Sequence, residues 1–406
     1  MSSIRQLIDG FQQYVCHTSP AMAEFVVHSA NGSYIMDAHG DAYLDFLCGI
    51  GVSNLGHAHP RILRRIREQL DKHLHVMVYG EYVIESQYEL AKKIASITPG
   101  ELTQTFFANS GAEAVEGALK LARKATGRQQ LISFVGAYHG DTFGALSVGG
   151  NSPHKQPFLP LLPGTVQIPF NDFEALGQID RNTAAVLVEP IQAEGGVILP
   201  RPGYLEALRQ RCNETGSLLI FDEVQTGIGR TGRWFACQHW QVVPDILVMA
   251  KALGGGMPLG CFTGSPELMR QLSSGTPLSH LTTFGGHPVS CAAGLGALEA
   301  IEEEHLLERA RLLSERIVQT LERWRADFPY LRDVRGKGLL IGLELDTDQR
   351  ALQVIRSSAV HGLIVGDCLY APTVVKLSPP LTLSDDEMET GLQKLRSALQ
   401  DSQVAE

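Results

Sequence analysis

The segment Ile246-Leu247-Val248-Met249-Ala250-Lys251 is a short apolar run that ends in a lysine. A second apolar run, Leu218-Leu219-Ile220-Phe221, ends in Asp222. Apolar runs of this length, when helical stretches separate them, are typical of buried parallel strands in an α/β domain. Further strands are expected at 105–108, 131–135, 166–169 and 184–188, with a helix at 112–126. The centre of the chain therefore predicts an α/β fold around a mostly parallel sheet.

The composition limits the kind of protein and its partners. The chain has 406 residues, 44% of them hydrophobic and 19% charged, as expected for a globular enzyme of two or three domains. Its net charge of −10 argues against nucleic acid or an anionic membrane as the main partner. The seven cysteines are scattered without a CxxC pair, no signal peptide is visible, and no apolar segment approaches the ~20 residues that span a bilayer. We therefore expect a cytoplasmic protein with reduced thiols.

The two ends of the chain are expected to form a second, smaller unit. Strand patterns occur at 335–345 and 374–377, a long helical stretch at 288–324, and a closing helix at 384–399 that starts with a capping box of Ser384 and Glu387. Near the N-terminus, 34–37 and 42–46 predict a hairpin. The expected organisation is an N-terminal segment (1–55) that packs with the small domain, a large domain (56–300) and a C-terminal small domain (301–406).

Lysine and aspartate at strand ends are costly to bury as ordinary charges. Ligands of such sheets bind at the carboxyl ends of the strands. Ser110 and Glu113 form another capping-box pattern at a helix start, and Gly111 allows close approach of the backbone, so this turn is suited to phosphate. Each feature alone is common in ordinary structure. Together, the phosphate turn, Asp222 and Lys251 predict a pyridoxal 5′-phosphate (PLP) site, in which the lysine forms a Schiff base and the aspartate keeps the pyridine nitrogen protonated.

Characteristic motifs cover nearly the whole chain, from about Asp37 to Leu399. They are Asn109-Ser110-Gly111-Ala112-Glu113-Ala114, Tyr138-His139-Gly140, Val188-Glu189-Pro190-Ile191-Gln192-Ala193-Glu194-Gly195-Gly196, Leu219-Ile220-Phe221-Asp222-Glu223-Val224-Gln225-Thr226-Gly227, Arg230-Thr231-Gly232, Lys251-Ala252-Leu253-Gly254-Gly255-Gly256 and Thr282-Thr283-Phe284-Gly285-Gly286. In this order they resemble class III (subgroup II, fold type I) aminotransferases, such as the ornithine, acetylornithine, 4-aminobutyrate, diaminobutyrate and diaminopelargonate enzymes. The resemblance implies a fold type I PLP transferase, whose large domain has a mostly parallel central sheet flanked by helices and whose smaller α+β domain comes from both termini.

The resemblance also implies roles for individual residues. Lys251 would bind PLP and carry the proton at Cα, Asp222 would pair with the pyridine nitrogen, and Tyr138 would stack on the ring. Val224 would pack on the other ring face, and Gln225 would reach the ring hydroxyl. The remaining predicted contacts are the phosphate ligands Ser110, Gly111 and Ala112, the supporting carboxylate Glu189, and Thr283, which would come from the partner subunit of a homodimer.

Two positions differ from the pattern of relatives that act on α-amino acids. Lys376 stands where those relatives carry an arginine, with Glu194 as its expected partner, and lysine lacks the planar fork that binds a carboxylate. Asp141 follows Tyr138-His139-Gly140, where ornithine and acetylornithine enzymes carry arginine. These differences predict an amine, diamine or ω-amino acid as donor and 2-oxoglutarate or pyruvate as acceptor, in a ping-pong reaction through Lys251.

Other functions stay open at this stage. An acetylornithine- or ornithine-type aminotransferase fits if Lys376 and Asp141 are only structural charges, and a PLP-dependent aminomutase or racemase would need no external oxo acid. A non-catalytic relative would conflict with the intact PLP residues. An NAD-dependent dehydrogenase is suggested by Gly227-Ile228-Gly229-Arg230-Thr231-Gly232, but five residues separate the first glycine from the strand. The pairs His57/His59 and His73/His75 lack a third ligand, so no metal site is predicted.

Overall fold

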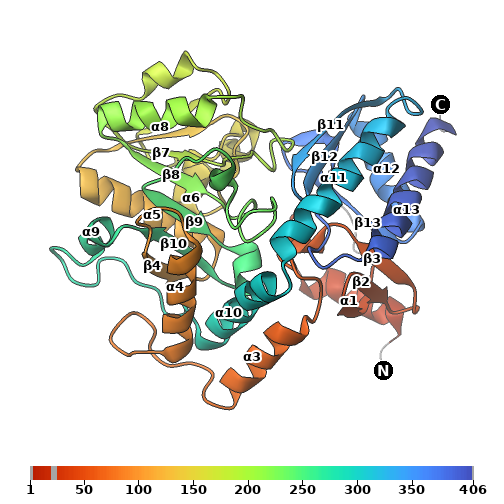
Figure 1. Ribbon diagram of the computed structural model, residues 1–406, viewed down its shortest axis with the longest axis horizontal. Helices are drawn as coiled ribbons and strands as arrows, with labels where there is room; N and C mark the ends of the chain where they lie inside the picture. The colour runs from red at the N-terminus through yellow and green to blue at the C-terminus, as the bar shows by residue number, and fades with distance from the viewer. Residues whose placement is uncertain (1–2, 20–24, 405–406) are drawn as a thin grey trace.

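The main sheet lies at the centre of the larger part of the molecule (Figure 1). The computed structural model describes residues 3–19 and 25–404. The sheet has seven strands in the order β4-β10-β9-β8-β7-β5-β6. Their bounds are β4 Gln104–Ala108, β5 Gln130–Phe134, β6 Thr165–Ile168, β7 Thr183–Val188, β8 Leu218–Asp222, β9 Ile246–Met249 and β10 Gly260–Gly264. Strands β5 to β9 pair in parallel, which confirms the predicted mostly parallel sheet.

Strand β10, which was not predicted, pairs antiparallel with both β4 and β9. This strand, Gly-Cys-Phe-Thr-Gly, has glycine at both ends, and glycine is unfavourable in strands. The register places Gly260 beside Ala108 and Gly264 beside Gln104. The start of β10 therefore lies at the carboxyl edge of the sheet, and its end lies at the opposite edge.

Both faces of the main sheet are covered, which explains the continuous apolar runs. In β8, Leu219 and Phe221 join one core cluster while Ile220 between them joins the other. In β9, Leu247 and Val248 are divided between the clusters in the same way. The principal helices around the sheet are α4 Glu85–Ile97, α5 Gly111–Thr126, α6 Phe143–Val148, α8 Tyr204–Thr215 and α10 Pro288–Glu303, and α3 Pro60–Leu70 packs against α10.

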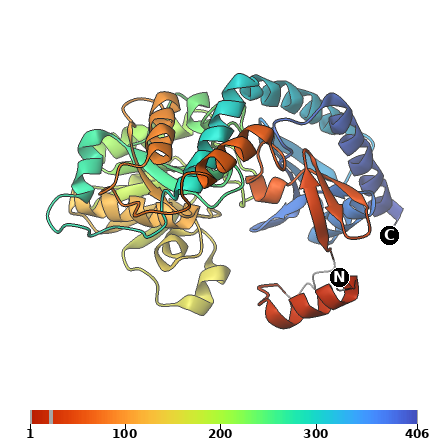
Figure 2. The same ribbon diagram turned by 90° about the horizontal axis from the view of Figure 1, so that it is seen from below.

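The chain ends, which were expected to form one smaller unit, build two further sheets. One has the order β1-β2-β3-β13 and the other β11-β12-β15-β14. Strands 34–37 and 42–45 form the expected antiparallel hairpin, and β3 pairs in parallel with β13, so N-terminal strands lie among C-terminal elements (Figure 2). The bounds are β1 Val27–Asn31, β2 Tyr34–Asp37, β3 Ala42–Asp45, β11 Leu331–Lys337, β12 Leu340–Leu345, β13 Leu363–Ile364, β14 Gly366–Cys368, β15 Ala371–Leu377, α12 Asp348–Val360 and α13 Asp385–Val404. The domain boundaries at 55 and 300 stay predictions.

The prediction of one continuous helical stretch at 288–324 is wrong. It consists of α10, which ends at Glu303, and α11 (Leu306–Trp324). His305 between them has a φ of 54°, a left-handed conformation that interrupts a helix. Neither glycine nor proline marks the break, so the break was not predictable from the residue pattern. Helix α11 runs from the main sheet toward the small domain (Figure 1).

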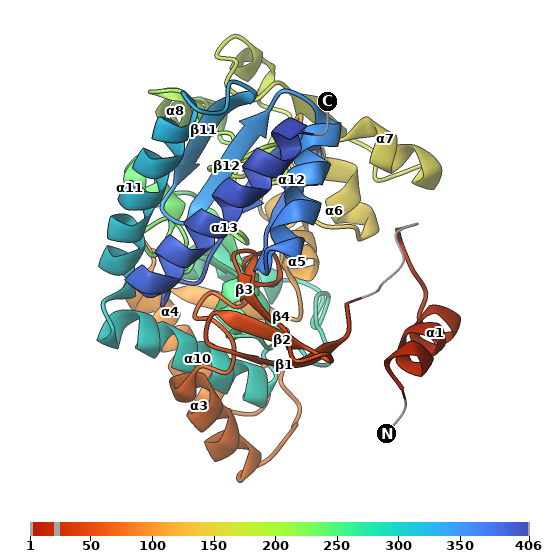
Figure 3. The ribbon, with the colours of Figure 1, turned by 90° about the vertical axis from the view of Figure 1, so that its right-hand side faces the viewer.

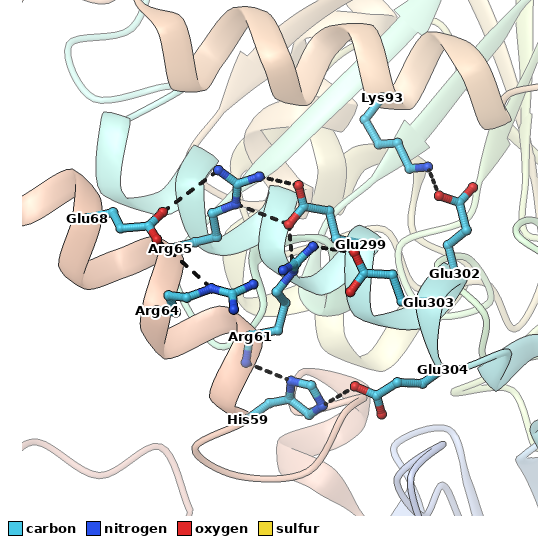
Figure 4. Close-up of polar contacts among 10 residues, drawn as sticks. All are labelled: His59, Arg61, Arg64, Arg65, Glu68, Lys93, Glu299, Glu302, Glu303 and Glu304. Atoms are coloured by element: carbon cyan, nitrogen blue, oxygen red, sulfur yellow. Dashed lines mark hydrogen bonds and ion pairs between the residues drawn. The ribbon is translucent and has the colours of Figure 1, made fainter.

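Charged side chains fasten α3 and α4 to α10 (Figure 4). Arg61 Nε lies 2.8 Å from a Glu299 carboxylate oxygen, and Arg65 Nε donates to the same carboxylate at 3.1 Å. From α4, Lys93 Nζ reaches Glu302 at 2.7 Å. These contacts hold the two helices against the end of α10, close to the connection with α11.

The remaining helices are short or peripheral. The N-terminal helix α1 (Ile4–Tyr14) has no buried side chain and lies to one side of the molecule (Figure 3). The short helices are α2 Cys48–Gly51, α7 Ser152–Lys155 and α9 Pro266–Met269. Within residues 3–19 and 25–404, no helix combines the length and the apolar character needed to cross a bilayer.

Candidate active site

A cavity of about 660 Å³ opens at the carboxyl edge of the main sheet, beside the start of α5. It collects all the predicted PLP contacts except Thr283, together with Asp141. Its walls include Ser110, Gly111, Ala112, Tyr138, Glu189, Asp222, Val224, Gln225 and Lys251. The strand ends that carry Asp222 and Lys251 are neighbours in the sheet, since β8 pairs with β9. The roles of these residues stay predictions, but their expected proximity is a feature of the structure.

Lys251 follows β9 and begins the 3₁₀ turn η4 (Lys251–Gly254) with a φ of 47°. This left-handed conformation is strained for a residue with a side chain, and such strain is common at functional sites. Burial lowers the pKa of the Lys251 amine below its ordinary value, and the Lys376 ammonium acts in the same direction against nearby carboxylates. A lowered pKa leaves more of the amine neutral, which is the form that attacks an aldehyde.

Asp222 is held by His139, to which the sequence motifs gave no role in the site. The Asp222 Oδ2 atom lies 2.7 Å from His139 Nδ1, and Oδ1 accepts a hydrogen bond from the Val224 amide at 3.0 Å. His139 lines the cavity, and its buried Nε2 has no hydrogen-bond partner among the described residues. His139 thus belongs to the site. Its place between Tyr138 and Gly140 in a recognised motif was the only signal in the sequence.

The turn before α5 fits a phosphate group, although its predicted capping box is only half formed. Ser110 Oγ accepts from the Glu113 amide at 3.2 Å. The Glu113 carboxylate accepts from the Asn109 amide at 2.9 Å, one residue before the position that a capping box requires. The same Glu113 oxygen also accepts from Asn109 Nδ2 at 2.8 Å. The prediction that the Glu113 carboxylate accepts from the Ser110 amide was therefore wrong.

Glycines allow the backbone segments of this region to pack closely. A Cβ atom at Gly260 would lie 2.1 Å from the Ser110 carbonyl oxygen, and one at Gly111 would lie 3.0 Å from Val224 Cγ1. Gly140 has a φ of +117°, and a Cβ there would lie 2.6 Å from the Ala112 Cβ. Free amides at the start of α5, close backbone packing and the unpartnered His139 Nε2 beside Asp222 together fit PLP.

Glu189 supports the wall of the cavity through backbone contacts. Its carboxylate accepts from the Tyr138 amide at 3.1 Å and from the Ala193 amide at 3.3 Å. Burial raises the pKa of Glu189 well above its ordinary value, and the charge of Asp222 raises it further. Glu189 thus holds the backbone on which Tyr138 lies, beside Asp222.

The predicted partnership of Glu194 and Lys376 is confirmed. Lys376 Nζ lies 2.5 Å from Glu194 Oε1, with the Lys376 side chain 1% exposed and that of Glu194 10% exposed. Glu194 also accepts from Gln225 Nε2 at 2.9 Å and from the Leu369 amide at 3.0 Å. Burial raises the pKa of Glu194, but Lys376 and the Leu369 amide outweigh it, so the pKa lies below its ordinary value. Gln225 points its amide at Glu194 here, and its contact with the ring hydroxyl stays a prediction.

Asp141 lies at the wall formed by Tyr138. The Tyr138 hydroxyl donates to Asp141 Oδ2 at 2.8 Å. Burial raises the pKa of Tyr138, and the hydrogen bond to Asp141 adds to the effect. The Tyr370 ring, from the turn before β15, packs edge-on to Tyr138 with ring centroids 6.2 Å apart. Asp141 is thus oriented by the residue predicted to stack on the cofactor.

Thr283 is exposed and does not line the cavity of its own chain. Its neighbour Thr282 accepts from Asn109 Nδ2 at 2.9 Å, which ties this segment to the turn before α5. Large apolar side chains are exposed near it in the chain and along the 74–88 segment, namely Leu281, Phe284, Leu74, Tyr79, Tyr82, Val83 and Tyr88.

The structure contradicts the dehydrogenase alternative. The segment from Gly227 to Gly232 forms consecutive turns, and the next regular element is the short 3₁₀ turn η3 (Ala236–His239). A dinucleotide fingerprint needs a helix that begins at these glycines, because the helix start binds the pyrophosphate. Arg230 is instead buried and donates to the Leu339 carbonyl at 3.0 Å, so the segment packs against the C-terminal part of the chain.

Comparisons with known proteins agree with the geometry of the cavity. A family described as Aminotransferase class-III matches residues 15–399. The acetylornithine aminotransferase of Methanosarcina mazei is 41% identical over 394 residues, which cover 97% of this chain and 96% of that protein. The ornithine aminotransferase structure from Toxoplasma gondii has a TM-score of 0.92 at 30% identity and covers 99% of this chain and 96% of its own. A thermostable (S)-enantioselective omega-transaminase from Thermomicrobium roseum has a TM-score of 0.90 at 29% identity, with 99% of both chains covered.

Proposed function

The chain belongs to the class-III aminotransferase family, and from this premise we propose that it moves an amino group from an amine, diamine or ω-amino acid to 2-oxoglutarate or pyruvate. The predicted family, fold and cofactor are confirmed, and the protein is a PLP-dependent aminotransferase. The donor, the acceptor and the individual residue roles are the proposed part.

Each proposed role follows from the residue's surroundings. PLP, when bound, supplies an aldehyde that condenses with amines and a cationic ring that accommodates negative charge. Lys251 binds the cofactor and then moves a proton at the donor carbon, for which a lowered pKa suits it. Asp222, oriented by His139, holds the ring nitrogen in its protonated form. Ser110 and the amides that follow it hold the phosphate.

One observation carries the choice of donor: Lys251 is the only lysine or arginine among the described residues that line the cavity. An α-carboxylate is best bound by a free cation, and above all by arginine. Lys376 is paired with Glu194, and Asp141 would repel a carboxylate at the cavity wall. A donor without an α-carboxylate fits this arrangement, whereas the carboxylate of the 2-oxo acid, which enters the same cavity in the second half-reaction, would need Lys376 to exchange Glu194 for it.

Single half-reactions test the proposal. Candidate donors are added one at a time to the purified holoprotein, and the visible absorbance band of the bound cofactor is followed. The panel holds glutamate, N-acetylornithine, 2,4-diaminobutyrate, 4-aminobutyrate, putrescine and an aryl amine. Loss of the band with amines or diamines, but not with N-acetylornithine, supports the proposal. Turnover without any oxo acid would instead support an aminomutase or a racemase.

A second candidate is an acetylornithine-type enzyme, because the Methanosarcina mazei relative carries that name. It requires that Lys376 leave Glu194 and bind the substrate carboxylate in place of an arginine. Rapid loss of the cofactor band with N-acetylornithine would favour this candidate and remove the amine donor.

We further propose a cytoplasmic homodimer in which Thr283 serves the partner's site. The exposed position of Thr283 and the exposed apolar side chains near it support this arrangement. The variants Lys251→Ala and Thr283→Ala, inactive or impaired alone, should regain activity when mixed. In the mixed dimer, one site combines an intact Lys251 with an intact Thr283. Mixtures no more active than the separate variants would place Thr283 in its own subunit's site.

A further inference from the structure

Asp141 is an unpaired carboxylate at the wall of the active-site cavity. It lines the cavity and is exposed, and within the described residues it forms no ion pair. Its hydrogen bond from the Tyr138 hydroxyl fixes its direction without neutralising its charge. A charged group that is positioned but not paired is available to a ligand.

The other carboxylates in and behind the cavity already have partners within the described residues. Glu194, behind the cavity, is paired with Lys376, and the buried Glu189 carboxylate accepts from the Tyr138 and Ala193 amides. Asp222 lies against His139 and faces the predicted ring nitrogen. Among the described residues that line the cavity, Asp141 is therefore the exposed carboxylate, held by one hydroxyl alone.

Two tyrosine rings lie beside Asp141. Tyr370 and Tyr138 pack edge-on at 6.2 Å. Burial raises the pKa of Tyr370 to about 12, and Asp141 is the first of the nearby carboxylates that contribute. A carboxylate next to two tyrosine rings attracts an organic cation, since the ring faces and the carboxylate favour the same charge.

We propose that Asp141, Tyr138 and Tyr370 form a subsite for the distal ammonium group of a diamine donor, an inference that rests on the proposed amino transfer. The amine that reacts approaches Lys251, and the second amine of the same molecule remains charged and lies against Asp141. The subsite selects diamines over monoamines of equal length and over donors that end in a carboxylate.

The test compares putrescine with butylamine, which has the same carbon chain and lacks the distal ammonium. The ratio of their kcat/KM values should fall roughly three- to tenfold in Asp141→Asn, the range expected for one partly exposed charge pair. The ratio should also fall as salt concentration rises. Asp141→Arg should reverse the preference and favour 4-aminobutyrate over putrescine. Glu267→Gln, which removes an exposed carboxylate from α9 at the opposite sheet edge, should leave the ratio unchanged.

Two further variants and measurements separate recognition from support of the fold. Tyr138→Phe removes the hydrogen bond to Asp141 and keeps the ring, so the ratio should stay above that of Asp141→Asn. Calorimetry with N,N,N′,N′-tetramethylputrescine, which cannot form a Schiff base, measures binding independently of activity. Its affinity should fall in Asp141→Asn by the same factor as the ratio.

The outcomes distinguish this inference from the proposed function. An active enzyme whose ratio and tetramethylputrescine affinity are unchanged in Asp141→Asn overturns the subsite and leaves the amino transfer intact. Equal losses for both amines would assign Asp141 only to the positioning of Tyr138, and would likewise overturn it. If no donor removes the visible absorbance band of the cofactor, the proposed donor class fails. Calorimetry still decides whether Asp141 binds a cation.

Discussion

Replacing Lys376 with methionine tests the buried ion pair behind the cavity. Loss of one partner of a buried pair typically destabilises a protein by about 3–5 kcal/mol, because the other charge stays buried alone. Glu194 would keep two donors, the Leu369 amide at 3.0 Å and Gln225 Nε2 at 2.9 Å. We therefore expect a loss near the lower end, about 3 kcal/mol.

The assay is urea unfolding of the holoprotein at saturating PLP, followed by circular dichroism. The chain provides a matched control in Lys72 and Glu85, which also lie 2.5 Å apart but have side chains 56% and 73% exposed. Lys72→Met should change the free energy of unfolding little, since exposed pairs are screened by water. The double variant Lys376→Met/Glu194→Gln should recover most of the loss. A Lys376→Met protein within about 1 kcal/mol of wild type, or a double variant as unstable as the single one, would refute the reasoning.

The remaining predictions concern pH, packing and the helix contacts. Because the pKa of Glu194 lies below its ordinary value, the contribution of this carboxylate to the free energy of unfolding is complete above the unfolded-state pKa and is lost as pH falls through the folded-state pKa. The stability advantage of wild type over Glu194→Gln should therefore shrink over that acid range, and a constant difference would contradict this. Gly260→Ala places a Cβ 2.1 Å from a backbone oxygen, so the free energies of PLP binding and of unfolding should both fall by about 1–3 kcal/mol or more. The control Gly177→Ala, whose Cβ would have no atom within 4 Å, should be nearly neutral, and equal effects of the two variants would argue against close packing at the phosphate turn. Glu299→Ala removes the partner of Arg61 and Arg65 and should lower the free energy of unfolding by about 1–2 kcal/mol in urea titrations, and no change would show that the contacts in Figure 4 are screened.

The parallel core of the fold was predictable because each strand is buried on both faces. That burial requires continuous apolar runs, and β8 and β9 show them directly in the sequence. Strand β10 lacks this signal, because glycine stands at both of its ends and Gly260 allows close packing against the Ser110 backbone. The break at His305 was invisible because no glycine or proline marks it.

The site was predictable where a local motif carries the function. The glycine turn before α5 and the strand-end residues Asp222 and Lys251 are features of this kind. His139 was missed, because its contact with Asp222 joins residues 83 positions apart and depends on the packing of separate strands. Glu194 and Lys376 were paired through the family resemblance, since no local pattern connects positions 182 residues apart.

The most direct test of the central claim is the identity of the lysine that binds PLP. The holoprotein is reduced with borohydride, which fixes the cofactor to its lysine, and the digested protein is analysed by mass spectrometry. A second lysine, Lys376, lies close enough to lower the pKa of Lys251, so the experiment has a meaningful alternative. The account predicts the pyridoxyl group on Lys251 alone. A pyridoxyl group on Lys376 or on any other lysine would contradict it.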